Sequence, residues 1–277
     1  MAETGARDRH DVPSQALRGP ALENFELEHR EPSAQLEDIV DYHWIVEWSV
    51  PASEERVQPV VTHPSIHLTV EGDRATVTGV VTRCFRRTLV GSGRVVGVRF
   101  RPSGFSALSP APASGFTDEA LPAADVLGAE AARELAGVGA GDRSVDVDEA
   151  VRRMEAVLRR RRRPRPRGAE VVDEAVDHIV ANADVTRVEQ VARHVGVSAR
   201  TLQRRFERFL GVGPKWVIQR RRIHEALEEI EHGRAMDWSA LALRLGFADQ
   251  AHFVHAFTEL IGQPPSTYEG VVDAQLE

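Results

Sequence analysis

Apolar positions in the last third of the chain recur with helical spacing, and the whole pattern occurs twice. In each copy, two apolar side chains four residues apart follow a glycine-containing turn, which places one apolar stripe along a helix. The offset between the copies is 50 residues before the turn and 51 after it, as five pairs show: Ala192 and Ala242, Gly196 and Gly246, Leu202 and Phe253, Phe206 and Phe257, and Pro214 and Pro265. The chain therefore contains an internal repeat of a helix, a turn and a second helix.

The turn residues of both copies fit a helix-turn-helix unit. Glycine can adopt the left-handed backbone of a tight turn, and Ser198 and Asp249 are placed to cap the helix that follows. The apolar stripe of this second helix, called here the recognition helix, leaves its opposite face free to enter a groove of DNA. One long helix, from Pro214 to about Glu231, is expected to join the two units.

The outward face of the first recognition helix carries Arg200, Gln203, Arg204 and Arg208. Arginine can bond guanine through two hydrogen bonds, and glutamine can bond adenine in the same way. Residues 187–222 hold ten Arg and Lys against two Glu, whereas residues 223–277 hold two Arg against ten Asp and Glu. Because cationic side chains supply most of the non-specific affinity for DNA, the first unit is expected to dominate binding.

The N-terminal half has strand-like apolar runs separated by turn residues. The runs are Tyr42–Val50, Ser65–Val70, Ala75–Val81 and Arg94–Phe100. Glu71 to Arg74 is typical of a hairpin turn between two of them. Helices are expected at Ala123–Leu135 and again from Asp146. An antiparallel sheet or a small barrel follows from this pattern.

The predicted fold class is α+β, with an antiparallel β-rich, barrel-like N-terminal domain followed by an all-α tandem helix-turn-helix domain. A chain of 277 residues has room for two domains. The expected segments are a disordered tail at 1–20, a β-rich sensing or dimerisation domain at 21–143, a helix and Arg/Pro-rich linker at 144–168, the DNA-binding domain at 169–270 and a tail at 271–277.

Composition narrows the class of protein further. The one cysteine, Cys84, excludes an intramolecular disulfide and a cysteine-rich zinc site. No stretch approaches the roughly 18 apolar residues that a membrane span requires, and the N-terminus lacks the apolar segment of a secretion signal. We therefore expect a soluble protein in the reducing cytoplasm, without a membrane partner.

The segment from Val188 to Tyr268 resembles the DNA-binding domain of the AraC/XylS transcription regulators. Four stretches carry the resemblance: the first unit with its Ala, Gly, Ser, Leu, Arg and Phe positions, the Gly211 to Pro214 step, Arg222 to Ala226 in the linker helix, and Leu245-Gly246-Phe247 in the second turn. It covers roughly a third of the chain. The resemblance implies double-stranded DNA and RNA polymerase as partners. An activator without a cofactor is expected, although the sequence leaves open whether the protein activates or represses transcription.

The resemblance also implies which side chains contact DNA. In the first recognition helix these are Arg200, Gln203 and Arg204, with Ser198 and Arg208 beside them. In the second they are Gln250, Ala251, His252 and His255. The chain departs from the family at His255, Thr258 and Glu269, where a basic residue is usual, so reading of a half-site by the second unit stays an open question.

The N-terminal half has a second resemblance. The run from Gly91 to Phe105, with His63 to Leu68, is similar to an uncharacterised domain fused to some AraC-type regulators. Candidate residues for binding a small-molecule effector are Trp44, Trp48, His67 and Arg99. The alternatives are that the tryptophans belong to the core and that Arg99 faces solvent.

The segment that connects the two halves allows two interpretations at two places. Val147, Val151, Met154 and Leu158 form an apolar seam, which either packs on its own N-terminal domain or pairs with a second copy of the chain. The arginine-rich block of residues 159–167 either adds phosphate contacts or acts as a solvated tether.

A DNA-targeted enzyme or a thiol sensor acting through Cys84 is the alternative function. Arg83, Arg86 and Arg87 could activate the thiol, but the chain lacks the Pro-Cys-His-Arg context of the alkyl-transfer repair domains. Neither nucleotide-binding glycine pattern is present, and Pro64 argues against a helical metal pair of His63 and His67. No catalytic residue and no metal site are expected.

Overall fold

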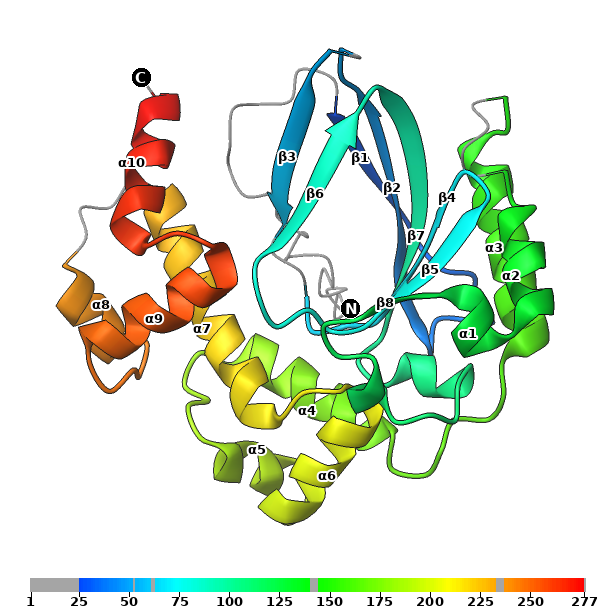
Figure 1. Ribbon diagram of the computed structural model, residues 1–277. Helices are drawn as coiled ribbons and strands as arrows, with labels where there is room; N and C mark the ends of the chain where they lie inside the picture. The colour runs from blue at the N-terminus through cyan, green and yellow to red at the C-terminus, as the bar shows by residue number, and fades with distance from the viewer. Residues whose placement is uncertain (1–24, 52, 61–62, 140–143, 233–236, 277) are drawn as a thin grey trace, which may run out of the picture.

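The computed structural model describes residues 25–51, 53–60, 63–139, 144–232 and 237–276. It has an N-terminal antiparallel β-sheet domain followed by a helical C-terminal region, so the predicted fold class is confirmed (Figure 1). The tail predicted for residues 1–20 lies outside the described residues.

The main sheet of the N-terminal domain has six antiparallel strands in the order β1-β2-β7-β4-β5-β8. Their bounds are β1 Phe25–Arg30, β2 Val40–Ser49, β7 Ser92–Phe100, β4 His67–Glu71, β5 Arg74–Thr78 and β8 Ala120–Pro122. A separate two-stranded ribbon pairs β3, Glu55–Val60, with β6, Phe85–Val90. All four predicted strands and the hairpin at residues 71–74 are confirmed.

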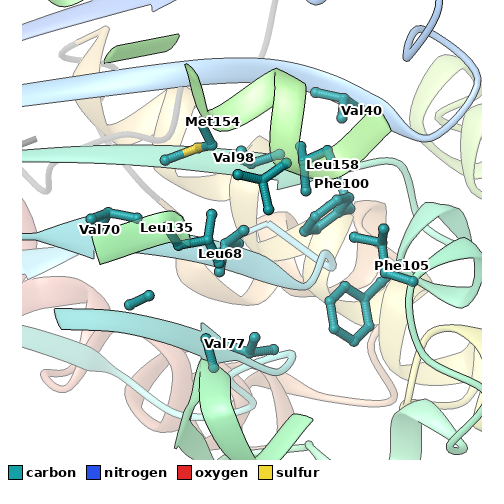
Figure 2. Packing of buried hydrophobic residues seen from close by; sticks show 14 of the residues in the cluster. Val40, Leu68, Val70, Val77, Val98, Phe100, Phe105, Leu135, Met154 and Leu158 are labelled. Atoms are coloured by element: carbon teal, nitrogen blue, oxygen red, sulfur yellow. The ribbon is translucent and has the colours of Figure 1, made fainter. Parts of the chain in front are cut away.

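The core of this domain lies between one face of the main sheet and three helices (Figure 1): α1 Ala123–Leu127, α2 Ala129–Ala136 and α3 Val147–Arg161. Alternate side chains of β7, Val96, Val98 and Phe100, are fully buried. Figure 2 shows Leu158 of α3 beside Phe100 and Met154 beside Val98 in this cluster. The seam of α3 therefore packs on its own domain, and this alternative, rather than pairing of α3 with a second copy, is the one observed.

The arginine-rich block after the seam is tied to the rest of the molecule by ion pairs. Arg160 and Arg161 pair with Glu134 of α2, and Arg162 pairs with Asp38 at 2.8 Å. Arg165 pairs with Asp173. These ion pairs hold the block against the rest of the molecule, so it is not a free solvated tether, while its phosphate contacts stay a prediction.

The C-terminal region consists of helices throughout: α4 Glu170–Ala181, α5 Val188–His194, α6 Ala199–Phe209, α7 Pro214–Glu231, α8 Trp238–Arg244, α9 Gln250–Ile261 and α10 Pro265–Leu276. They form two apolar cores, one per helix-turn-helix unit, joined by α7. The expected tail at 271–277 is largely helical, because Val272 of α10 is fully buried in the second core. Among the described helices, none has the length and apolar composition needed to cross a membrane.

Candidate nucleic-acid interface

The first helix-turn-helix unit is formed by α5, a turn at Gly196 and the recognition helix α6. Gly196 has φ +67°, the left-handed conformation that the sequence predicted. The Ser198 hydroxyl accepts a hydrogen bond from the backbone N–H of Thr201 at 3.2 Å and so caps α6. Leu202 and Phe206 are fully buried, which fixes the rotation of the helix about its axis.

With that stripe buried, the predicted DNA-contacting residues of α6 face solvent. Arg200, Gln203, Arg204 and Arg208 are all exposed. The amide nitrogen of Gln203 donates to the carboxylate of Glu207 at 2.9 Å. The Arg208 guanidinium lies over the Phe209 ring, 5.4 Å from its centroid. The face thus offers cationic and amide donors without any rearrangement of the helix.

The second unit repeats this geometry in α8, a turn at Gly246 and the recognition helix α9. Gly246 has φ +74°, and the Asp249 carboxylate accepts from the backbone N–H of His252 at 2.8 Å. Phe253 and Phe257 are fully buried. The local fold of the two units is the same although their charges are opposite.

The candidate residues of α9 are also exposed, but two of them have partners inside the unit. Gln250 accepts a hydrogen bond from the Ser239 hydroxyl at 2.8 Å. The His252 ring meets the Phe247 ring edge-on, with centroids 5.3 Å apart. Ala251 and His255 lie beside them on the same exposed surface. This surface is less basic than that of α6.

Arg222 of α7 links the two units directly. Its guanidinium donates to the carbonyl of Thr186 in the first unit at 2.9 Å and to that of Gly246 in the second at 3.1 Å. The side chain is buried and lies over the Phe247 ring, and burial lowers its pKa from the ordinary value. The relative position of the two recognition helices is therefore held by a charged bridge as well as by the linker helix.

Three of the four effector candidates meet on the sheet face opposite the helices. The Trp44 indole N–H donates to Nδ1 of His67 at 3.2 Å. Arg99, which pairs with His67 across β4 and β7, contacts Asp41 at 3.1 Å and donates to the Tyr42 hydroxyl at 3.1 Å. The register brings these residues together because alternate positions of adjacent strands share a face.

The fourth effector candidate, Trp48, lies apart from the other three. It packs with Val50 and Leu89 in a small apolar cluster near the β3–β6 ribbon. Its indole N–H donates to the Val90 carbonyl at 3.3 Å. For Trp48, the structure therefore favours the alternative interpretation, in which the tryptophan belongs to the apolar core and does not bind an effector.

The linker helix contributes a residue to this region that sequence reasoning missed. His224 of α7 is buried, and its ring stacks on that of His63, with centroids 5.7 Å apart. Neither of its ring nitrogens, nor Nε2 of His67, has a hydrogen-bond partner among the described residues. Burial lowers the pKa of both histidines to about 3, and the charges of Arg220 at His224 and of Arg99 at both add to this effect. The linker helix α7, which joins the two helix-turn-helix units, is thus close to the sheet face that carries the effector candidates.

Within the described residues, no group of three or more His, Cys, Asp or Glu side chains is arranged to hold a metal ion. Cys84 is half-buried, and its thiol donates to the Ile261 carbonyl at 3.2 Å. This cysteine therefore makes a contact between the two halves of the chain.

Comparison with known proteins agrees with the geometry. Residues 191–270 match the family described as a helix-turn-helix domain, and residues 28–122 match a domain of unknown function (DUF6597). The chain is similar to a probable AraC family transcriptional regulator from Rhodopseudomonas palustris, with 25% identity, 37% of this chain and 97% of that one covered, and a TM-score of 0.34.

Two further solved structures are similar. The DNA-binding domain of the global transcriptional factor AdpA, in complex with a target DNA, is 27% identical over 39% of this chain and 93% of that one, with a TM-score of 0.32. ToxT from Vibrio cholerae is 11% identical over 90% of this chain and 98% of that one, with a TM-score of 0.39. The chain has a C-terminal double helix-turn-helix domain of the AraC/XylS type behind an N-terminal domain of unknown function, and it is a DNA-binding transcription regulator.

Proposed function

We propose that the protein reads a two-part DNA site, with one recognition helix in each of two successive major grooves on the same side of the duplex. The observation that supports this is the exposure of the outward faces of both α6 and α9 while their apolar stripes are buried. The 18-residue linker helix spans about 27 Å, comparable with the roughly 34 Å of one turn of DNA.

The two helix-turn-helix units have unequal roles in this proposal. Arg200, Gln203 and Arg204 contact bases, while Ser198 and Arg208 contact phosphates. In the second unit, Gln250, Ala251, His252 and His255 face the groove with few positive charges nearby. Since phosphate contacts provide most of the sequence-independent affinity, the first unit contributes the larger share of binding.

The N-terminal domain acts as the sensing part in this proposal, and the protein works as a regulator without catalysing a reaction. Trp44, His67 and Arg99 lie together on one sheet face, beside His224 of the linker helix. The buried ring nitrogens of His67 and His224 that lack a partner among the described residues lie close to Arg99, an arrangement that suits a small anionic ligand with an aromatic or apolar body.

The remaining partners and the location follow from the class of protein. RNA polymerase is the partner of an AraC-type activator in the cytoplasm. Any homodimer forms through a surface other than the apolar seam of α3, since that seam is buried within its own domain.

Selection of binding sites from random DNA tests the proposal. The whole protein and its Arg204→Ala variant are compared at fixed salt. We expect an enriched two-part site, with base preference relaxed at one position in the variant at a cost of about 1–3 kcal/mol. Equal loss of affinity on all sequences would assign Arg204 to a phosphate, and salt-sensitive binding without any enriched site would contradict sequence-specific reading.

A further inference from the structure

Both recognition helices end at a glycine in the left-handed conformation. Gly211 follows α6 with φ +96°, and Gly262 follows α9 with φ +85°. They occupy equivalent positions in the internal repeat, 51 residues apart. The last turn of a helix leaves carbonyl groups without partners inside the helix, and these can be satisfied by groups from elsewhere. In this protein the N-terminal domain donates to such carbonyls in the last turn of α9 and to the Gly211 carbonyl just beyond the end of α6.

At the first unit, the partner is the segment just before β8. The Thr117 hydroxyl donates to the Gly211 carbonyl at 2.8 Å. A Cβ atom added at Gly211 would lie 2.7 Å from the Thr117 hydroxyl oxygen and 2.8 Å from the Ala113 carbonyl oxygen. The approach is therefore so close that only glycine permits it.

At the second unit, the partner is the segment just before β6. The backbone N–H of Cys84 donates to the Glu259 carbonyl at 3.1 Å, and its thiol donates to that of Ile261 at 3.2 Å. A Cβ atom at Gly262 would lie 2.9 Å from Sγ of Cys84 and 3.0 Å from the Arg86 guanidinium. Both contacts approach the glycine that follows the recognition helix, at similar closeness, although the carbonyls that accept hydrogen bonds differ.

The two contacting segments are joined to each other within the N-terminal domain. The Asp118 carboxylate accepts from the backbone N–H of Thr82 at 2.7 Å and from its hydroxyl at 2.6 Å, and the Asp118 N–H donates to the Val80 carbonyl at 2.9 Å. Asp118 has φ +60°, which a residue other than glycine adopts at an energetic cost. Thr117 is next to Asp118 in the chain, and Cys84 lies two residues after Thr82, so the hydrogen bonds between Asp118 and Thr82 join the two contacting segments.

We propose that this pair of segments, residues 80–86 and 113–118, grips the C-terminal ends of both recognition helices and sets the distance and orientation between the two DNA-reading heads. The proposal rests on the two-part DNA reading proposed above. The grip lies at the helix ends, whereas Arg204 and His255 on the outward faces stay exposed. The contact therefore determines which number of base pairs between the two half-sites the protein can bind. The base contacts of each half-site are made by the recognition helices.

The test uses Asp118→Gly in the full-length protein. Glycine accepts φ +60° without strain, so the substitution removes the carboxylate that joins the segments while the backbone keeps its conformation. Asp118→Asn keeps a side-chain oxygen for Thr82 and serves as the conservative variant. Asp73→Gly, in the exposed turn between β4 and β5, is the matched control.

The first measurement is amide hydrogen exchange at residues 209–213 and 259–264, which needs no DNA. We expect protection in the wild type, faster exchange in Asp118→Gly, and wild-type behaviour in Asp118→Asn and Asp73→Gly. Exchange in the wild type as fast as in Asp118→Gly would overturn the grip itself. Because this measurement is independent of DNA, it decides the grip even if the selection experiment enriches no site.

The second measurement is affinity for the selected site with one or two base pairs inserted or deleted between its halves. The wild type should lose about tenfold or more for each change, and Asp118→Gly less than about threefold, with single half-site affinity unchanged. Thr117→Ala, which removes only the contact to the first unit, should broaden the spacing preference partly. An unchanged spacing profile in Asp118→Gly, or an equal loss on every spacing, would overturn the assignment of spacing to the grip.

Discussion

The two helix-turn-helix units have one fold and opposite charge, and this contrast separates the residues that determine structure from those that determine DNA binding. A glycine turn, a capped recognition helix and two buried apolar positions recur in both units. Residues 187–222 carry a net charge of +8, and residues 223–277 carry −8. The shared positions are buried or in turns, whereas the positions that differ in charge lie mostly on the surface, where folding constrains them little.

The largest expected effect is a loss of stability on removing a buried aromatic ring that both units have. Phe206→Ala and Phe257→Ala remove equivalent, fully buried rings, and each should cost about 3–5 kcal/mol of unfolding free energy. Chemical denaturation of the two variants measures the cost. Similar losses would support equivalent cores, whereas a loss under about 1 kcal/mol at either position would show that the two units are not built alike.

The next effect concerns the bridge between the units. Arg222→Met keeps the length of the side chain but removes its hydrogen bonds to Thr186 and Gly246, at a cost of about 1.5–3 kcal/mol. We expect the two units to unfold less cooperatively in calorimetry. Lys215→Met removes a positive charge from an exposed position of the same helix and is the control. A single transition, unchanged in temperature, would exclude a bridging role for Arg222.

The next effect is the loss of DNA affinity, which should differ between substitutions in the first and in the second helix-turn-helix unit. Arg204→Ala should cost about 1–3 kcal/mol of binding free energy on the selected site, and His255→Ala less than about 0.5 kcal/mol. Titration of labelled DNA at one fixed salt concentration measures both. A larger loss of binding for His255→Ala than for Arg204→Ala would mean that the second unit dominates DNA binding. As a control for folding, both variants should keep the wild-type melting temperature.

The smallest expected effect is the loss of stability on removing the helix cap that each unit has. Ser198→Ala and Asp249→Ala each remove the cap of one recognition helix and should cost about 1 kcal/mol. Thermal unfolding measures the loss, and Ser266→Ala, at an exposed position of α10, is the control. No change in either variant would mean that the capping hydrogen bonds add nothing to stability.

The sequence predicted the elements whose signals are local. Gly196, Gly246 and the two caps lie within a few residues of the helices that they define, and Pro214 marks the start of α7. The β3–β6 ribbon escaped prediction because most of its positions are exposed or half-buried, so no clean alternation marks its strands.

The contacts that depend on distant residues could not be predicted in the same way. Arg222 stands in a motif that the sequence reveals, but its acceptors lie 24 and 36 residues away. The approach of His224 to the sheet, and of Cys84 to the end of α9, joins segments whose proximity follows from tertiary packing alone. The internal repeat identifies Gly211 and Gly262 as equivalent, without indicating that both meet the N-terminal domain.

The central claim is that two units of the same fold read DNA unequally, with the basic unit leading. The most direct measurement is the affinity of the whole protein for its selected site after each half is scrambled in turn, the first half being the one at which Arg204→Ala relaxes base preference. We predict that scrambling the first half reduces binding to the non-specific level, while scrambling the second leaves clear preference for the first. Equal losses for the two halves, or a greater loss for the second, would contradict the account.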